Sequence, residues 1–96
     1  MVKHKRSRIS LFFMFTVYVL YSRTHDRIYI GFTSNLDERF KSHNELGKKG
    51  WTKNFRPWEI MHTEIFDDKR EAMRREKELK TAKGREWIRL MIGRSF

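Results

Sequence analysis

The 96-residue sequence predicts one small α+β domain, in which helices flank a three-stranded, mainly antiparallel sheet. Three observations support this fold class. Two short apolar segments near the N-terminus are joined by a polar link, as in an antiparallel hairpin. A third apolar segment lies in the middle of the chain. Two capping patterns start amphipathic helical stretches, one before and one after that segment. The expected element order is β-β-α-β-α-α.

The first two strands are predicted to form an antiparallel hairpin. Residues 17–22 are rich in Val, Leu and Tyr, which favour strands, and residues 23–26 form a short polar link. Residues 27–33 alternate in character, so the second strand has two distinct faces. One face consists of Ile28, Ile30 and Phe32, and the other of Arg27, Tyr29 and Gly31. The glycine inside this strand indicates that another group approaches the backbone closely there.

A first helix and a third strand follow the hairpin. Ser34 fits the N-cap position and Asp37 supplies an acid at the third helical position, so a helix is expected to run to about Leu46. A basic loop at residues 47–50 ends this helix. Residues 58–66 are rich in large apolar side chains and are predicted to form the third strand.

Two more helices are expected after the third strand. Asp68 and Glu71 form a second capping pattern, and a strongly charged helix is expected from there to about Lys80. Residues 81–84 break the helical pattern. A short last helix is predicted over residues 85–92. Its apolar residues are Trp87, Ile88, Met91 and Ile92.

The composition favours a polyanion as the partner. Lys and Arg number 22 against 12 Asp and Glu, and the net charge of +10 far exceeds what solubility requires. Nucleic acid is favoured over an acidic membrane surface. The absence of cysteine excludes disulfides and Cys-based zinc sites and is compatible with a reducing cytoplasm. We expect a cytoplasmic monomer with no small-molecule cofactor.

Residues 1–15 are interpreted as a basic and apolar leader in front of a single domain at residues 16–93. Four Lys and Arg side chains within residues 3–8 precede an apolar run that ends at Leu20. This resembles the start of a signal peptide, but no small-residue cleavage site follows, and the run is only about half a membrane span. A peptide that binds membrane surfaces is the competing interpretation of this segment.

Three polar side chains lie where helical periodicity expects apolar ones. Arg39 and His43 share a stripe of the first helix with Leu36. Glu76 lies on the stripe of the second helix that should touch the sheet. Because a buried carboxylate without a partner is costly, a divalent cation or a nearby Arg would stabilise it. Alternatively, Arg39 extends to water from the edge of its stripe, and Glu76 forms a structural pair with Arg39 or a Tyr hydroxyl.

These residues together match the needs of phosphodiester cleavage. Tyr18 and Tyr29 can face the same side of adjacent strands, although such pairs also occur simply as sheet stabilisers. A carboxylate such as Glu76 can hold a divalent metal ion, which polarises the phosphate. A guanidinium such as Arg39 can neutralise charge on the phosphoryl oxygens. A phenol with a lowered pKa can accept the proton of the nucleophile.

The same residues carry a resemblance to the GIY-YIG nucleases. Thr16-Val17-Tyr18 and, ten residues later, Tyr29-Ile30-Gly31 resemble the paired motif that names the family, with Thr and Val replacing the first Gly and Ile. In the following helix, Arg39 matches the family's catalytic arginine. Residues 71–80 resemble the helix of the metal-binding glutamate, which falls on Glu76. The resemblance extends to small stand-alone bacterial members that are similar to the nuclease domain of an excision-repair subunit.

The resemblance implies an α/β sandwich around a three-stranded antiparallel sheet, and hydrolysis of DNA by water with one Mg²⁺ or Mn²⁺ ion. Glu76 would bind the metal and Arg39 would stabilise the transition state. Tyr29 or Tyr18 would be the general base, and His43 would position a phosphate or assist that base. Many members also carry an asparagine downstream of the glutamate. Residues 77–96 contain no Asn, so the resemblance implies the fold more firmly than the activity.

Nucleic acid is expected to contact the basic loop and one side of the second helix. The loop interleaves cations with aromatic rings, and the helix carries cations at positions i, i+4 and i+7. The expected contact residues are Lys48, Lys49, Trp51, Lys53, Arg70, Arg74 and Lys77. The alternative is that the aromatic rings cover the core and the cations are merely solvated. No motif suggests base-specific recognition, so we expect weak sequence specificity and an affinity that falls steeply with salt.

The sequence therefore predicts a metal-dependent endonuclease that acts on DNA, or on RNA, in repair or processing, without a membrane partner. The alternative is a non-catalytic nucleic-acid-binding module on a degenerate GIY-YIG fold.

Overall fold

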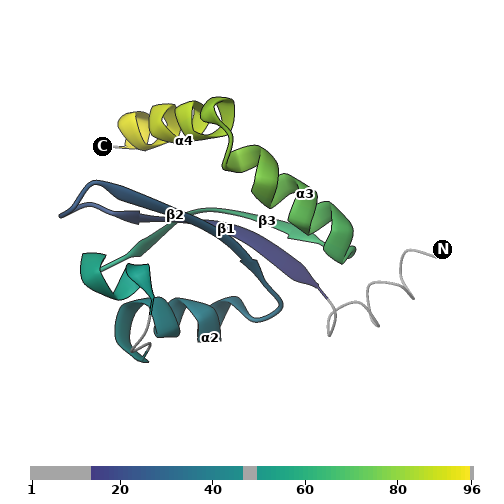
Figure 1. The fold of residues 1–96 in the computed structure, drawn as a ribbon, viewed down its shortest axis with the longest axis horizontal. Helices are drawn as coiled ribbons and strands as arrows, with labels where there is room; N and C mark the ends of the chain where they lie inside the picture. Colours follow the sequence, from purple (N-terminus) through teal and green to yellow (C-terminus); the bar gives the residue numbers. More distant parts are fainter. Residues whose placement is uncertain (1–13, 47–49, 96) are drawn as a thin grey trace.

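The computed structural model of the chain describes residues 14–46 and 50–95. Its elements are the strands β1 (Phe15–Ser22), β2 (Arg27–Thr33) and β3 (Glu59–Phe66), the helices α2 (Leu36–Lys41), α3 (Lys69–Leu79) and α4 (Ala82–Ser95), the π-helical turn η1 (Ser42–Leu46) and the 3₁₀ segment η2 (Trp51–Phe55). The predicted order and the α+β fold class with a three-stranded antiparallel sheet are confirmed (Figure 1).

The central strand of the sheet is β1. The strand order is β2-β1-β3, and both outer strands run antiparallel to β1. Tyr18 of β1 lies opposite Gly31 of β2 on one side and opposite Thr63 of β3 on the other. The predicted hairpin is therefore present, and it brings the two tyrosine motifs onto neighbouring strands.

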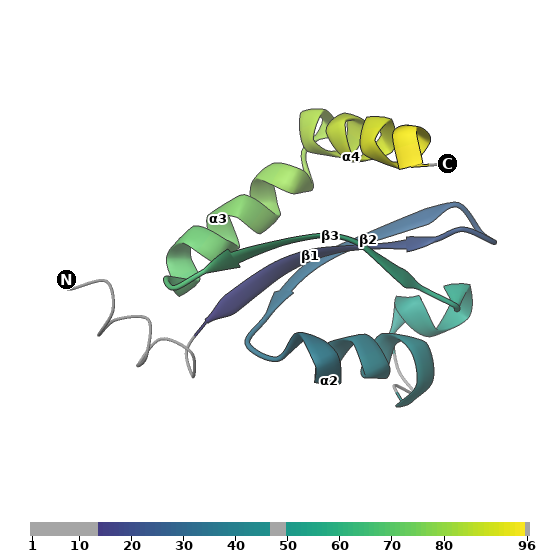
Figure 2. The ribbon, with the colours of Figure 1, turned by 180° about the vertical axis from the view of Figure 1, so that it is seen from behind.

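Helices cover both faces of the sheet, with α3 and α4 on one side and α2 on the other (Figures 1 and 2). Because side chains of a strand alternate between faces, β1 contributes to two separate clusters. Val17 and Val19 pack with Leu79 of α3 in the main core. Tyr18 and Leu20 are fully buried in a second cluster on the α2 side. The predicted faces of β2 are confirmed: its isoleucines enter the main core, and its tyrosine packs against the second cluster.

The N-cap of the first helix is Asn35, so the prediction of Ser34 is wrong by one residue. Asn35 Oδ1 accepts a hydrogen bond from the Glu38 N–H at 3.1 Å, and Asn35 Nδ2 donates to Glu38 Oε2 at 3.2 Å. Thr33 Oγ1 accepts from the Asn35 N–H at 3.1 Å, and this turn brings Asn35 into the cap position. The N-cap bond of a capping box is therefore present one residue later than expected, but Glu38 accepts from the Asn35 side-chain amide and not from its backbone N–H.

The last helix begins at Ala82, three residues before its predicted start. Thr81 Oγ1 accepts from the Gly84 N–H at 3.1 Å, which caps the helix in the stretch that the sequence predicts as a break. A side chain at Gly84 would collide with the Glu78 carbonyl oxygen and the Leu79 backbone, because α4 turns sharply against the end of α3. Glycine therefore permits the close elbow between the two helices.

The N-terminal prediction falls mostly outside the described residues. β1 begins at Phe15, two residues before the predicted strand start, and only the last two residues of the expected leader at 1–15 are described. Over the described stretches, 14–46 and 50–95, no helix is long and apolar enough to cross a lipid bilayer.

Candidate active site

Tyr18 forms the buried centre of the site. Its side chain is fully buried, and its Oη atom is 2.9 Å from His43 Nε2. Burial raises the pKa of the Tyr18 phenol far above its usual range, and the nearby Tyr29 adds to this effect, while the Arg39 guanidinium opposes it. Tyr18 is therefore a neutral phenol at pH 7 and serves as a hydrogen-bonding group.

Gly31 leaves the space that the Tyr18 ring occupies. A Cβ atom on Gly31 would lie 2.7 Å from Tyr18 Oη, 2.9 Å from Tyr18 Cζ and 3.1 Å from Tyr29 Cε2. The expected close approach to this glycine is confirmed, and the approaching group is the cross-strand tyrosine of the first motif. The two tyrosine rings lie side by side with centroids 6.1 Å apart.

His43 is held between β1 and η2. It is buried, its Nε2 atom contacts Tyr18, and its Nδ1 atom lies 2.9 Å from Thr52 Oγ1. Burial lowers the pKa of His43, and the Arg39 and Arg56 guanidinium groups lower it further. The imidazole is therefore neutral at pH 7 and links Tyr18 to Thr52 in one hydrogen-bonded chain.

The remaining predicted site residues line an open cleft beside these hydrogen-bonded side chains. Tyr29, Gly31, Arg39, Lys69 and Glu76 contribute to a cleft of about 410 Å³ between β2, α2 and α3. The structure thus brings together a phenol, two cations and a carboxylate. Arg39 is an exposed residue of α2, yet its guanidinium lies close enough to Tyr18 and His43 to affect the pKa of both groups.

Glu76 pairs with Lys80, one helical turn later. The Glu76 side chain is 19% exposed, and its Oε2 atom is 3.3 Å from Lys80 Nζ. The cation paired with Glu76 is thus the i+4 residue Lys80, the C-cap of α3, and not Arg39 as in the alternative interpretation. The carboxylate remains part of the cleft wall and is accessible from it.

Comparison with known proteins identifies the family. The GIY-YIG catalytic domain family matches residues 14–89. The chain belongs to the GIY-YIG family. It is 43% identical to a UPF0213 protein of Staphylococcus haemolyticus over 54 residues, which are 56% of this chain and just under two thirds (66%) of that protein. It is 40% identical to a UPF0213 protein of Natronomonas pharaonis over 65 residues, 68% of this chain and 75% of that one.

A solved structure is also similar to this GIY-YIG domain. It is the solution NMR structure of a UPF0213 protein from Bacillus halodurans, with 30% sequence identity, a TM-score of 0.49, and coverage of 78% of this chain and 81% of that chain.

The donor atoms of the GIY-YIG cleft fit one divalent ion of the magnesium type. Among the described residues no group of three or more His, Asp or Glu side chains could enclose a metal ion. The cleft instead offers the Glu76 carboxylate, whose side chain is 19% exposed and lines the cleft. Mg²⁺ and Mn²⁺ accept such sites, because they bind oxygen ligands and keep several waters.

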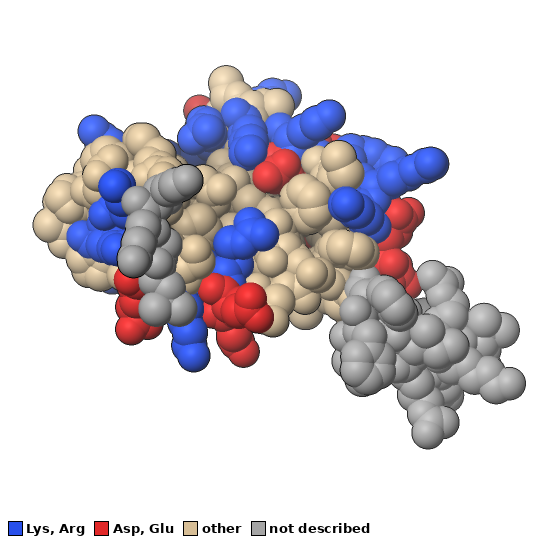
Figure 3. Space-filling view, turned by 60° about the horizontal axis from the view of Figure 1, so that its bottom comes forward, with Lys and Arg blue, Asp and Glu red and all other residues tan. Residues whose placement is uncertain are grey.

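The predicted nucleic-acid contacts are spread over two surfaces of the GIY-YIG domain. Arg70, Arg74 and Lys77 are exposed along α3. Figure 3 shows that most Lys and Arg side chains of one face gather along its upper margin. Trp51 is 47% exposed, and its ring packs 4.5 Å from Phe55. Lys53 is exposed as well. Lys48 and Lys49 lie outside the described residues.

Sequence reasoning missed three residues of the site. Thr52 orients the imidazole, Lys69 lines the cleft, and Lys80 pairs with the carboxylate. The i+4 spacing of Glu76 and Lys80 is a readable signal for that pair. Nothing in the sequence indicates the contact of Thr52, because it depends on how η2 folds against His43.

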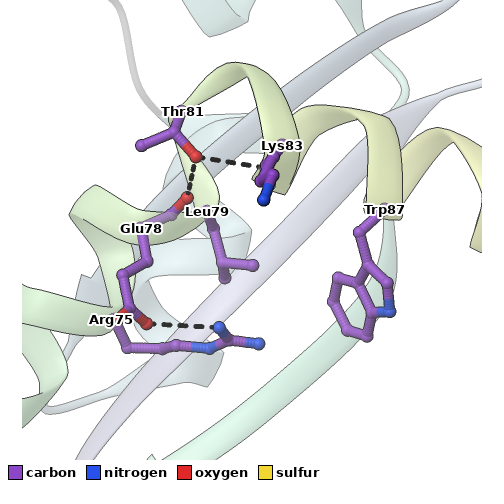
Figure 4. Close-up of a pocket in the computed structure, with 7 residues that line it drawn as sticks. Arg75, Glu78, Leu79, Thr81, Lys83 and Trp87 are labelled. Atoms are coloured by element: carbon purple, nitrogen blue, oxygen red, sulfur yellow. Dashed lines mark hydrogen bonds and ion pairs between the residues drawn. The ribbon is translucent and has the colours of Figure 1, made fainter.

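Another cleft of about 500 Å³ lies at the elbow between α3 and α4 and includes Trp87 and Lys83 (Figure 4). Its Arg75 is already paired with Glu78 at 3.3 Å and with Glu64 at 2.8 Å. The positive charge of Arg75 in this elbow cleft is thus compensated within the protein.

Proposed function

We propose that this GIY-YIG domain is a divalent-metal-dependent endonuclease that hydrolyses phosphodiester bonds in DNA, with weak sequence specificity and a role in repair or processing. The observation that carries the proposal is the cleft in which Tyr29, Arg39, Lys69 and Glu76 meet. Phosphoryl transfer needs anion-binding groups, a site for a metal ion and a proton acceptor in one solvent-accessible space.

The cations of the cleft bind the substrate phosphate. Arg39 projects from the end of α2 and Lys69 from the start of α3, so they reach into the cleft from different elements. A guanidinium can form two parallel hydrogen bonds with phosphate oxygens, and its charge offsets the negative charge that builds up in the transition state. Removal of such a group typically lowers turnover by roughly 10²–10³-fold.

Glu76 would hold the divalent ion, and a bound ion would supply Lewis-acid polarisation of the substrate phosphate. The ammonium group of Lys80 keeps the Glu76 carboxylate paired in the absence of the ion. Since an i,i+4 pair of this kind contributes only about 0.3–0.5 kcal/mol, it presents a small barrier to exchange for a divalent cation.

Tyr29, rather than Tyr18, accepts the proton of the attacking water, and it does so as a phenolate whose own proton has first passed to solvent in the open cleft. Tyr29 lines the open cleft, whereas Tyr18 is fully buried and hydrogen-bonded to His43. The raised pKa of Tyr18 also makes its phenolate unavailable near neutral pH. Tyr18 and His43 act as positioning residues, and the His43 ring lies 4.7 Å from the Tyr29 ring, centroid to centroid.

The second candidate function is a non-catalytic module that binds nucleic acid. The Glu76–Lys80 ion pair favours it, because the carboxylate has a partner without any metal ion. The absence of Asn from residues 77–96 points in the same direction.

A nicking assay on supercoiled plasmid distinguishes the two functions. Wild-type protein with Mg²⁺ or Mn²⁺ should nick the plasmid, and Glu76→Gln and Arg39→Gln should lose this activity by at least about 10²-fold. Glu86→Gln, at an exposed position of α4, serves as the matched control and should cut normally. If the wild type binds DNA and RNA but cuts neither with any divalent metal ion, the nuclease proposal fails and the binding module stands.

A further inference from the structure

Beyond the cleft, we propose a second site: a basic groove along the open edge of β2 that holds unpaired nucleotides next to the bond being cut. The groove has a volume of about 370 Å³. Its polar and aromatic lining residues are Arg27, Tyr29, Trp51, Lys80, Arg85 and Arg89. This inference rests on the proposed nuclease function for its biological meaning, but the groove can be tested by binding alone.

The groove adjoins the cleft directly. Tyr29 lines both spaces, so this residue lies where the two meet. Glu76 of the cleft and Lys80 of the groove are joined by their ion pair, which places the two spaces on consecutive turns of α3. A strand whose phosphate lies at Arg39 and Glu76 would therefore continue across Tyr29 into the groove.

The charge of the groove is positive and only partly compensated. No carboxylate is among the residues that line it. Arg85 donates to the Lys80 carbonyl at 3.2 Å, and Arg27 donates to the His25 carbonyl at 3.2 Å, so each keeps its full positive charge. Arg89 forms an ion pair with Asp26 at the far end. This distribution suits a phosphate backbone that enters at the cleft and passes Arg85 and Arg27.

Trp51 gives the groove its preference for unpaired bases. Its indole is 47% exposed, and it is supported from behind by Phe55 and Trp58, with ring centroids 4.5 and 5.8 Å away. A rigid, exposed aromatic ring beside a basic track is the arrangement on which single-stranded bases stack. Bases inside a duplex are already stacked on each other and cannot use this surface.

The elbow cleft between α3 and α4 supplies matched control residues (Figure 4). Trp87 is 43% exposed, nearly as much as Trp51, but it lies in the elbow cleft. Lys83 and Arg85 are two residues apart near the start of α4, and they line the elbow cleft and the β2 groove, respectively. Substitutions at Trp87 and Lys83 thus remove an exposed indole and a single positive charge without touching the groove.

The experiment measures binding of fluorescent ten-nucleotide oligonucleotides by anisotropy in EDTA, using protein with Glu76→Gln throughout. A single strand should bind more tightly than a duplex of equal length. Trp51→Ala should weaken single-strand binding by roughly 5- to 100-fold, since stacking contributes that much per base. Arg85→Gln should reduce the salt slope by about 0.7, the loss of one phosphate contact on a single strand. Trp87→Ala and Lys83→Gln should leave binding within about twofold.

An abasic oligonucleotide of the same length tests whether base stacking contributes to binding, using protein in which all groove residues are unchanged. It should bind about as weakly as the normal strand binds to the Trp51→Ala variant, because its phosphates remain but nothing can stack. The proposal is overturned if the abasic strand binds as tightly as the normal strand or if the protein binds duplex more tightly than single strand. It is also overturned if Trp51→Ala and Trp87→Ala have the same effect on binding. A third contradicting outcome is that poly-glutamate competes for the protein as well as the oligonucleotide does. The binding assay contains no free metal ion and is independent of the nicking assay. Loss of cleavage in the nicking assay therefore does not count against the groove. Normal cleavage does not support the groove if the binding assay contradicts it.

Discussion

Replacement of Gly31 by alanine should destabilise the domain, although alanine is otherwise an acceptable strand residue. The new Cβ atom would lie 2.7 Å from Tyr18 Oη, and ordinary contact begins at about 3.4 Å. Tyr18 has no room to retreat, because its side chain is fully buried and bonded to His43. The substitution therefore forces either the tyrosine ring or the β1–β2 pairing to move.

The size of the effect follows from three contributions. Overpacking a buried site costs about 1–3 kcal/mol. Loss of the Tyr18–His43 hydrogen bond costs about 0.5–1.5 kcal/mol more. Replacing a glycine restricts the unfolded chain and returns about 0.4–1 kcal/mol. The net expectation is a loss of roughly 0.5–4 kcal/mol of unfolding free energy, against the about 5–15 kcal/mol typical of a domain.

Urea denaturation followed by circular dichroism measures this loss, with Gly93→Ala as the control. Gly93 lies in α4, and a Cβ atom there would meet nothing within 4 Å. In a helix, alanine in place of glycine should be neutral or stabilise by up to about 1 kcal/mol. If Gly31→Ala proves as stable as the wild type, the packing argument for the two tyrosine motifs is wrong.

Three further predictions concern the pKa of buried groups and the helix elbow. Because burial raises the pKa of Tyr18 in the folded state, the contribution of this phenol to stability is present below pH 10 and is lost above it. The free energy of unfolding of Tyr18→Phe should therefore fall less than that of the wild type between pH 9 and 11. Urea titrations at each pH measure this difference. Because the pKa of His43 is lowered, the unfolded chain takes up this proton first, and stability should decline as pH falls below about 6.5. Thermal melts from pH 8 to 5 should show a shallower decline for His43→Gln; an equal slope would contradict the assigned environment. Gly84→Ala should lower the melting temperature strongly, since its side chain would strike the α3 backbone; an unchanged melting temperature would show that the elbow can open freely.

Local patterns were sufficient to predict the architecture. The alternation in β2 correctly assigned its two faces, and the capping patterns found both first turns to within one residue. These features depend on neighbours in the chain, which is why they are readable from sequence. The early start of α4 was missed, because Thr81 and Gly84 resemble a break unless the approach of α3 is known.

The sequence predicted which residues belong to the site, but not how their side chains are arranged. Periodicity placed Arg39, His43 and Glu76 together on buried stripes, yet only His43 is buried. Arg39 lies in α2, whereas His43 lies in the π-helical turn η1, so the regular helical spacing that predicts one shared stripe does not continue between them. Contacts between distant segments, such as Thr52 with His43 or Arg85 near Tyr29, depend on tertiary packing that no local pattern encodes.

The central position of β1 also bears on how such a sequence can change over generations. Val17 and Val19 belong to the main core while Tyr18, between them, belongs to the site, so the two functions alternate residue by residue. Point substitutions can alter one role and spare the other. A single inserted or deleted residue within the strand would exchange all of these roles at once. We therefore expect related domains to accept only similar side chains at each buried position of β1, and to gain or lose residues in the turns outside it.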